Sequence, residues 1–443
     1  MVLQTILEKM VKESVKNILT FSAEGIGRVT FSDIADNTKK EMNALGVKIL
    51  SVIIEQVEQV FNQSRDKHRI VIRNKNKMRR LLTEMGEVEI KHTLYCDKVA
   101  GRYFFPADEI LKIEKRARIE NGLKAKLISD ATITSYGKAA TLANNGVSRQ
   151  TVFNLVKRLN NFSAPIVKPN SKVEEIFIEA DEDHIHLNTG KPADVKLVYV
   201  HEGRTIENGR TKLINPRYFV SASGSKDLWN DVDDYLCSFY RPYHSIIHLS
   251  GDGATWIRQG VALYPNVRYH LDKFHVQRAL TALSAGKKGL FRDLYFAVYN
   301  GDEHLFHSVK AQYDIIGKEA NREALYLSDN IDFIDRDSSC CAESHVSHVL
   351  SARMSSRPMG WSISGADRIG KLRAYMFNKG EFRALIDMQM SESKQTPKSK
   401  ERDYNSSIRK NGSSSQVMQC GIVEFRPTYT AYAKLIKSII KEF

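Results

Sequence analysis

Three acidic side chains occur where the sequence pattern predicts that carboxylates meet. Asp181 lies in the stretch IFIEADEDHIHL and Asp252 in IIHLSGDGATWI, each at or just past an apolar, β-branched run that predicts a strand. Glu343, in CCAESHVSHVL, opens an amphipathic helical pattern. Two carboxylates at strand ends and a third on a helix can together hold a pair of divalent cations, and such a pair can catalyse phosphodiester cleavage. The three residues therefore predict a site for metal-dependent phosphoryl transfer.

The residue types suit magnesium. Two Mg²⁺ ions about 4 Å apart can activate the attacking oxygen and stabilise the leaving one. Mg²⁺ prefers hard oxygen ligands and keeps several waters, so a few carboxylates suffice, and Mn²⁺ could substitute. Asp is short and suits a rigid strand end, whereas Glu reaches further and suits a helix approaching from the side. We expect Asp181, Asp252 and Glu343 to be both the metal ligands and the catalytic residues.

Each carboxylate also has a plain structural interpretation. Asp183 and Glu179 share a strand face with Asp181 by period-two alternation, so the choice of first ligand stays open. Asp181 could be a turn carboxylate in a hairpin, and Asp252 could belong to an ordinary Gly-Asp-Gly turn after a strand. Glu343 could be a solvated helical residue. Spacing alone does not establish that the three converge.

A histidine follows the next predicted strand. The stretch VRYHLDKFHVQRAL predicts a strand that runs into a helix, with Asp272 and His275 at the junction. His275 would contact the scissile phosphate or support the site, and it could equally cap the helix. It is therefore a fourth candidate catalytic residue.

A zinc site is a competing interpretation of the segment around Glu343. Two cysteines and two histidines occur there: Cys340, Cys341, His345 and His348. Histidines at i and i+3 on a helix can share a metal, but adjacent cysteines lack the spacing that structural zinc sites favour. His184 and His186 could also bind a metal, although alternation along a strand accounts for them.

The texture of the chain divides it into regions. Helical periodicity dominates the start, and strand patterns begin at about residue 173. The expected regions are 1–64, N-terminal helices; 65–110, a basic segment and β-hairpin; 111–162, a helix-turn-helix DNA-binding region; 173–275, the first part of an RNase H-like core; 276–338, a helical insertion; 339–390, the rest of the core with the helix carrying Glu343; and 391–443, a polar basic tail with a short C-terminal helix. Residues 161–172 are expected to be a linker. The predicted fold class is multidomain α/β, with a mixed-sheet RNase H-like catalytic core interrupted by helices.

A helix-turn-helix pattern lies in SYGKAATLANNGVSRQTVFNLVKRL. The first helix is expected from about Ser135 to Ala143, followed by an Asn-Asn-Gly turn, with Ser148 as the N-cap of the second. In such motifs the second helix offers its side chains to the major groove. The expected DNA-reading residues are Arg149, Gln150, Asn154 and Lys157. Two helices around a glycine turn also occur in proteins that do not bind DNA.

Further arginines follow Glu343. Arg353 and Arg357 come 10 and 14 residues after it, along a similar side of the predicted helix, and we expect them to contact the DNA backbone. Residues 65–80 also carry eight Lys or Arg against one Asp, as a solvated face or as a further backbone contact.

The bulk composition agrees with a nucleic-acid partner. The 443 residues carry a formal net charge of +14, which favours a polyanion. The odd number of cysteines, five, fits a reducing compartment. The N-terminus does not resemble a signal peptide, and no run approaches 18 apolar residues, so we expect a cytoplasmic, nucleoid-associated protein without a membrane partner.

Five blocks of sequence together resemble bacterial DDE insertion-sequence transposases, most closely the ISLre-two family. They are EADEDHIHL, KLVYVHEG, SGDGATWI, LDKFHVQRAL and AESHVSHVLSARMSSRPMGWS, and the resemblance covers about residues 65–390. It implies an RNase H-like core with a helical insertion, an upstream DNA-binding region and a two-Mg²⁺ mechanism. It places the first Asp on Asp181 rather than Asp183, the second on Asp252 and the Glu on Glu343. The His-containing block falls on residues 273–275.

The expected function is DNA transposition. The protein would bind the inverted-repeat ends of its insertion sequence, hydrolyse a strand at each end and join the 3′-hydroxyls to target DNA. Two ends must meet, so a homodimer or larger synaptic assembly is expected. The alternatives are an RNase H-like nuclease or resolvase that cuts without joining, and a catalytically silent DNA-binding regulator.

Overall fold

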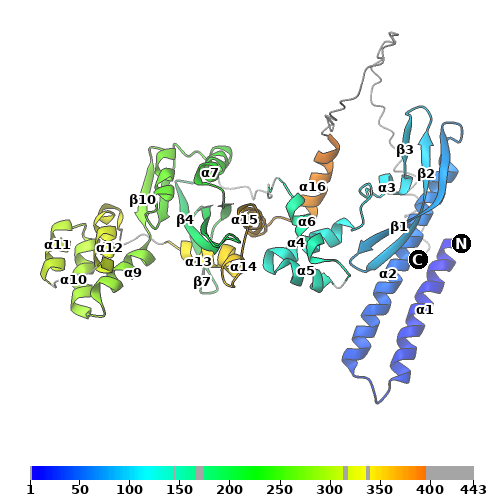
Figure 1. The fold of residues 1–443 in the computed structure, drawn as a ribbon, viewed down its shortest axis with the longest axis horizontal. Helices are drawn as coiled ribbons and strands as arrows, with labels where there is room; N and C mark the ends of the chain where they lie inside the picture. The colour runs from blue at the N-terminus through cyan, green and yellow to red at the C-terminus, as the bar shows by residue number, and fades with distance from the viewer. Residues whose placement is uncertain are drawn as a thin grey trace, which may run out of the picture. The chain divides into compact units, whose positions relative to one another are not determined.

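The chain folds into two compact units, in a computed structural model that describes residues 2–143, 145–160, 162, 164, 173–312, 318–335 and 340–395 (Figure 1). The first unit comprises Met1–Lys124, Ala143–Gly146 and Met390–Phe443, and the second comprises Ala125–Leu142 and Val147–Gln389. Helices and a mixed sheet are both present, so the prediction of a multidomain α/β protein is confirmed. Most of the predicted linker at 161–172, and the C-terminal tail with its short helix beyond residue 395, lie outside the described residues.

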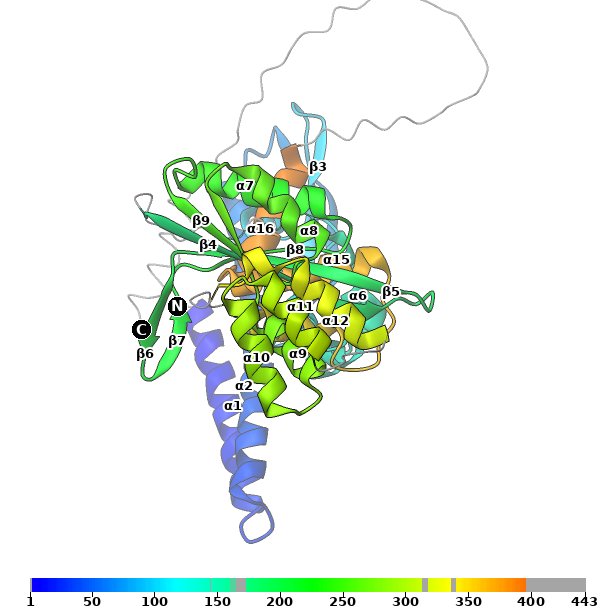
Figure 2. The same cartoon turned by 90° about the vertical axis from the view of Figure 1, so that its left-hand side faces the viewer.

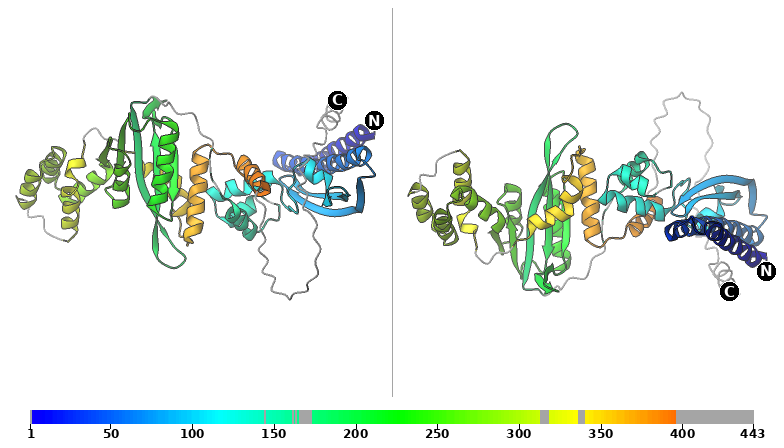
Figure 3. Two further views of the ribbon diagram at one scale, coloured as in Figure 1. Left: turned by 90° about the horizontal axis from the view of Figure 1, so that it is seen from above. Right: turned by 90° about the horizontal axis from the view of Figure 1, so that it is seen from below.

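The first unit is built on two long helices and a three-stranded antiparallel sheet (Figure 3). Its elements are α1 (Val2–Glu24), α2 (Phe31–Ser64), β1 (Ile70–Thr83), β2 (Gly86–Asp97), β3 (Arg102–Phe104) and α3 (Pro106–Ile110). Thr30 and Asp33 form a capping box that starts α2. Ile54 and Val57 of α2 pack against Val88 and Ile90 of β2, which joins the helix to the sheet.

The basic segment 65–80 supplies most of strand β1, which differs from the expected hairpin. The strand pairs with β2 from Ile70 opposite Asp97 to Thr83 opposite Gly86. The predicted return strand at GRYFFP is present as the short β3. Residues 73–78, which include Arg73, Lys75 and Lys77, are exposed in succession, and the pairing register shifts there, so the alternation that identifies a strand is lost in this part of the basic segment.

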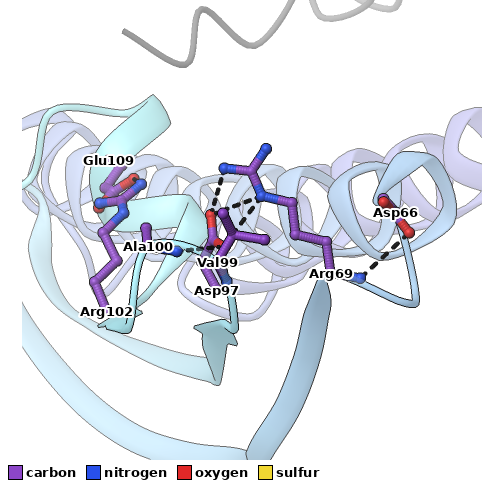
Figure 4. Close-up of polar contacts among 7 residues, drawn as sticks. All are labelled: Asp66, Arg69, Asp97, Val99, Ala100, Arg102 and Glu109. Atoms are coloured by element: carbon purple, nitrogen blue, oxygen red, sulfur yellow. Dashed lines mark hydrogen bonds and ion pairs between the residues drawn. The ribbon is translucent and has the colours of Figure 1, made fainter. Parts of the chain in front are cut away.

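Asp97 organises the turn between β2 and β3 (Figure 4). Its carboxylate accepts from the guanidinium of Arg69 at 2.8 Å and from the backbone N–H groups of Val99 and Ala100 at 3.0 and 3.1 Å. The hydrogen bond with Arg69 is the largest of the effects that lower the pKa of Asp97 to about 2. Asp66 caps the preceding turn by accepting from the N–H of Arg69.

A second acidic residue of this unit is buried without a cation. Glu58 on α2 is 8% exposed, and its carboxylate accepts only long hydrogen bonds of 3.4 Å from the N–H groups of Thr93 and Ala107. Burial is the main reason that the pKa of Glu58 is raised to about 7.

The second unit contains a five-stranded mixed sheet in the order β10-β9-β4-β5-β8 (Figures 1 and 2). The strands are β4 (Glu175–His186), β5 (Pro192–His201), β8 (Arg217–Ser221), β9 (Ile246–Gly251) and β10 (Val267–Leu271). Strands β4, β5 and β8 are antiparallel neighbours, whereas β9 pairs parallel with β4 and β10 parallel with β9. A small hairpin, β6 (Arg204–Glu207) with β7 (Arg210–Leu213), extends between β5 and β8 in the chain.

Helices cover both faces of this sheet. Helix α7 (Ser225–Phe239) buries Leu228 and Val232 against Ile178 and Val198 on one face (Figure 2). The other face receives α15 (Ile363–Phe377), where a side chain at Gly370 would clash with Val220 at 2.6 Å. The period of two along β4 therefore points Ile176, Ile178 and Ala180 to one layer and the acidic residues at 179, 181 and 183 to the other.

Among the described residues between β10 and Glu343, the structure has helices and no strand. They are α9 (Lys273–Ser284), α10 (Lys288–Tyr299), α11 (Glu303–Gln312) and α12 (Lys318–Ser328), gathered beside β10 in Figure 1. Two further helices are the short α8 (Thr255–Arg258) after β9 and α16 (Phe382–Gln395) after α15. Among the described helices, none is both long and apolar enough to cross a membrane.

Candidate functional site

Glu179, the first acidic residue on this face of β4, has hydrogen-bond partners for both carboxylate oxygens and stabilises the fold. It is 2% exposed, and its carboxylate accepts from Tyr199 Oη at 2.5 Å and Arg204 Nη2 at 2.5 Å, with His201 Nε2 at 3.0 Å. It also accepts from the backbone N–H of Cys341 at 2.6 Å. Although burial opposes ionisation, the hydrogen bond and charge of His201 and the charge of Arg204 lower the pKa of Glu179 to about 2. Glu179 thus fixes the chain just before Glu343.

Asp183, the third residue on this face, holds the far end of the same segment. One carboxylate oxygen accepts from the hydroxyls of Ser351 at 2.9 Å and Ser355 at 2.8 Å. Its second oxygen is buried without a hydrogen-bond partner. Burial raises the pKa of Asp183, and the two serine hydroxyls oppose that rise. Glu179 and Asp183 together tie both ends of the Glu343 segment to β4.

Asp181, between them, faces the other candidate carboxylates. It is 6% exposed; Oδ1 accepts from the N–H of Glu182 at 2.8 Å, and the buried Oδ2 has no hydrogen-bond partner among the described residues. Burial raises the pKa of Asp181 to about 7, the charge of His275 opposes the rise, and the charges of Asp252 and Glu343 add to it. The structure therefore brings the three predicted residues into one electrostatic neighbourhood.

Asp252 occupies a constrained turn after β9. A side chain at Gly251 would lie 3.0 Å from the carbonyl of Ala180, and Gly253 has a φ of +94°, so glycine suits both flanking positions. The carboxylate of Asp252 accepts from the N–H of Ala254 at 2.9 Å. Its backbone carbonyl accepts from the hydroxyl of Tyr326 on α12 at 2.9 Å. The helical insertion is thus bonded directly to this turn.

Glu343 lies in the first turn of α13 (Ala342–Val346) and is exposed. The helix widens into a π-helical turn at Ser347–Ser351 before α14 (Ala352–Met354). Such turns occur often at functional sites. The carboxylate oxygens of Asp181, Asp252 and Glu343 do not form a group within 4.8 Å of one another. Like charges repel, so a shared metal would require a closer approach of these side chains.

His275 is oriented by its neighbour Asp272. Asp272 caps α9 by accepting from the N–H of Phe274 at 3.0 Å, and its second oxygen lies 3.0 Å from His275 Nδ1. The prediction that His275 itself caps the helix is therefore wrong. Burial lowers the pKa of His275, but Asp272, Asp181 and Asp252 outweigh burial and raise it. His275 thus belongs to the neighbourhood of Asp181.

The alternative zinc ligands do not gather. Among the described residues, no three of Cys340, Cys341, His345 and His348 bring ligand atoms within 4.8 Å of one another. His345 Nδ1 lies 3.0 Å from the hydroxyl of Tyr218, and burial is the main effect that lowers its pKa to about 4.

A different cluster meets that distance within the described part of the chain. Its members, Glu182, His184 and Asp194, lie on the opposite face of β4 from Asp181. His184 pairs across the strands with Asp194, and their side chains are 2.8 Å apart. The sequence singled out His184 and His186 but not Asp194, because only the pairing of two strands places Asp194 opposite His184.

Two helices, α5 (Tyr136–Ala143) and α6 (Arg149–Arg158), lie where the sequence predicted the two helices of the motif, and α4 (Asn121–Ile133) precedes them. Ser148 caps α6 by accepting from the N–H of Thr151, which confirms the predicted cap, and Val152 and Val156 are buried. The four expected reading residues, Arg149, Gln150, Asn154 and Lys157, are exposed. Gln150 donates to Asn154 at 3.1 Å, so these two side chains lie side by side on the open face.

Arg353 does not lie on the surface, so the expectation that it contacts DNA is wrong. It is 4% exposed, donates to the carbonyl of Ala131 at 3.0 Å, and lies 4.9 Å from the ring centre of Trp361. Arg357 is exposed. The π-helical turn between Glu343 and these arginines changes the helical phase, so counting at α-helical spacing misplaced Arg353.

Comparisons with known proteins identify relatives. The model of a family described as Uncharacterised protein family (UPF0236) matches residues 27–327. A UPF0236 protein of Caldanaerobacter subterraneus subsp. tengcongensis is 33% identical over 379 residues, which are 81% of each chain. Another from that organism is 32% identical over 376 residues, 81% of this chain and 80% of the relative, and its name joins eleven locus labels. A UPF0236 protein of Streptococcus gallolyticus is 30% identical over 235 residues, 49% of this chain and 52% of the relative.

Proposed function

The chain belongs to the UPF0236 family, and we propose that this member is a DDE transposase of the ISLre-two type. It would bind the inverted-repeat ends of its own element, cut them by metal-dependent hydrolysis and join the 3′-hydroxyls to target DNA. The observation that carries the proposal is that the charges of three residues from separate segments, Asp252, Glu343 and His275, all act on the carboxylate of Asp181.

The strand order supports an RNase H-like core. Such a core has three antiparallel strands joined as consecutive hairpins, followed by two strands parallel to the first. Strands β4, β5 and β8 form the antiparallel set, and β9 and β10 run parallel to β4. Asp181 on the first strand and Asp252 after the fourth then lie on adjacent strands. This placement is what a shared metal site requires.

The donor set fits Mg²⁺. Asp181 carries a buried oxygen without a donor, which a cation would satisfy, and Asp252 and Glu343 add hard oxygen ligands from two directions. Mg²⁺ bound there would activate the attacking oxygen and stabilise the leaving one. Tyr326 and the flanking glycines hold the Asp252 turn in place. His275, oriented by Asp272 and favoured in its protonated form, would contact a phosphate oxygen.

The distribution of relatives supports a mobile element. One relative has a name that joins eleven locus labels of a single organism. Repeated loci with one protein name are expected of a sequence that copies or moves itself within a genome. The net charge of +14 and the exposed face of α6 support DNA as the partner.

The test is a pair of matched acidic variants on DNA that carries the gene and its flanking sequences. Asp252→Asn should abolish Mg²⁺-dependent cleavage of that DNA and leave binding unchanged, because the amide oxygen of asparagine can still accept from the N–H of Ala254. Mg²⁺ should also raise the melting temperature of the wild-type protein by about 3 °C and that of Asp252→Asn by less. The control is Asp227→Asn, which alters an exposed acid on α7 and should cut at the wild-type rate. Cleavage by Asp252→Asn at the wild-type rate would refute the assignment.

A strand-transfer assay separates the remaining alternatives. A labelled pre-cut end incubated with plasmid should give a joined product if the protein is a transposase. A nuclease or resolvase gives cut DNA without joined product. A silent regulator binds the ends without metal and cuts neither substrate.

A further inference from the structure

Two arginines of the second unit are buried without an acidic partner. Arg353 and Arg373 are each 4% exposed, and within the described residues neither forms an ion pair. Burial is the main reason that the pKa of Arg373 is lowered to about 10, and the charge of Arg353 adds to it. Two buried like charges are costly, so the hydrogen bonds that hold them matter.

Both guanidinium groups bind the last turn of α4. Arg353 Nε donates to the carbonyl of Ala131 at 3.0 Å, and Arg373 Nη1 donates to that of Thr132 at 2.6 Å. Carbonyls at a helix C-terminus lack helical partners and carry the negative end of the dipole, so they suit a cation. Helix α5 follows two residues after α4, and its first residue Tyr136 lies beneath Arg353, 6.0 Å from ring centre to guanidinium.

The same groups hold the helical run that carries Glu343. Arg373 donates through Nε to the carbonyl of Val349 and through Nη2 to that of His348 at 2.6 Å. Both carbonyls belong to the π-helical turn, whose wider spacing leaves carbonyls to be satisfied from outside. Arg353 itself lies in α14, at the end of this run. One planar guanidinium thus bridges α4 and the Glu343 segment, which a lysine could not do.

We propose that Arg353 and Arg373 are positioning residues that couple the DNA-reading helices α5 and α6 to Glu343. DNA bound on α6 would then fix the place of Glu343 relative to Asp181 through α4 and the π-helical turn. The inference rests on the proposed function, because Glu343 has a role in cleavage only if the protein is a transposase. Neither arginine is proposed to contact DNA or metal.

The test compares Arg373→Lys with Arg217→Lys, which alters a partly buried arginine on β8 that donates to the carbonyl of Ala164 at 3.3 Å. At a temperature well below both melting points, Arg373→Lys should cut flanking DNA about 100-fold more slowly with its binding constant within about threefold, because a displacement of about 1 Å is enough. Arg217→Lys should lower the melting temperature, and any change in its cleavage rate should be matched by a change in its binding constant. Equal rates for Arg373→Lys and wild type would overturn the inference and leave the proposed function standing.

If the wild-type protein cuts no DNA, the proposed function is refuted. Hydrogen exchange then tests the coupling by itself. Arg373→Lys should speed exchange together at the end of α4 and at 347–351, whereas Arg217→Lys should not. Faster exchange confined to α15, the helix of Arg373, would overturn the coupling.

Discussion

The hydroxyl of Tyr326 donates to the backbone carbonyl of Asp252 across 2.9 Å, although 74 residues separate them. The bond joins α12 of the helical insertion to the turn that carries the second carboxylate. Asn330, just after α12, reinforces the joint, because its Oδ1 accepts from Arg258 and lies against Gly253. The insertion is therefore a support for the candidate site.

Removal of that hydroxyl should weaken the site more than the fold. Tyr326→Phe should cost about 1 kcal/mol of unfolding free energy and reduce cleavage of flanking DNA about tenfold, because the Asp252 turn loses its anchor. The matched control is Tyr299→Phe in the same helical region, since the buried Tyr299 hydroxyl has no hydrogen-bond partner in the part of the chain that the structure describes. Denaturant unfolding and single-turnover cleavage measure both effects. Equal losses in the two variants would contradict this role for Tyr326.

The pH dependence of stability should reveal the buried Glu58. Its folded-state pKa of about 7 lies above the ordinary value of 4.5, so the native state holds more protons between these values. Stability from this group is therefore complete at low pH and is lost as pH rises through 7. Glu58→Gln cannot ionise and should gain about 2 kcal/mol on the wild type between pH 5 and pH 8. Urea unfolding at the two pH values is the measurement, with exposed Glu55→Gln as the control; a constant difference would show that Glu58 does not titrate there.

The acids of β4 should differ sharply in their effect on folding. Glu179→Gln should lower the unfolding free energy by about 3 kcal/mol, because it leaves the partly buried Arg204 and the buried His201 beside a neutral amide. Asp183→Asn should cost about 1 kcal/mol, because an amide oxygen can still accept from the serines. Thermal and denaturant unfolding of both variants test the order. A larger loss for Asp183→Asn would reverse the roles assigned here.

The exposed face of α6 should separate affinity from sequence preference. Arg149→Ala should weaken binding to any duplex and reduce the salt dependence by about one phosphate contact. Gln150→Ala should reduce the preference for flanking DNA over scrambled DNA by about 1 to 3 kcal/mol. Melting temperatures should not change, because both side chains are exposed. Lys226→Ala on α7 is the control in a salt titration of binding; an equal loss there would show that binding follows charge alone.

Interactions between residues close together in the sequence could be predicted, whereas interactions between distant segments could not. The Ser148 cap and the turn around Asp252 follow from residue preferences within a few positions. Alternation placed Glu179, Asp181 and Asp183 on one face but could not tell which has a partner, because the partners come from residues 199–204 and 341–355. Arg353 was misplaced because a π-helical turn breaks the period of 3.6. Asp194 was not predicted because the sequence of one strand does not determine its register with the next strand.

The buried Oδ2 of Asp181, which accepts no hydrogen bond among the described residues, has an evolutionary consequence. Glu179 and Asp183 hold the Glu343 segment, whereas Asp181 bonds only to the N–H of its own neighbour. Selection for folding therefore protects Glu179 far more strongly than Asp181. If the protein is the transposase proposed above, a gene copy that loses Asp181 should still yield a stable protein with an intact α6 that binds the same DNA ends. Such copies would then compete with the intact ones and limit their spread.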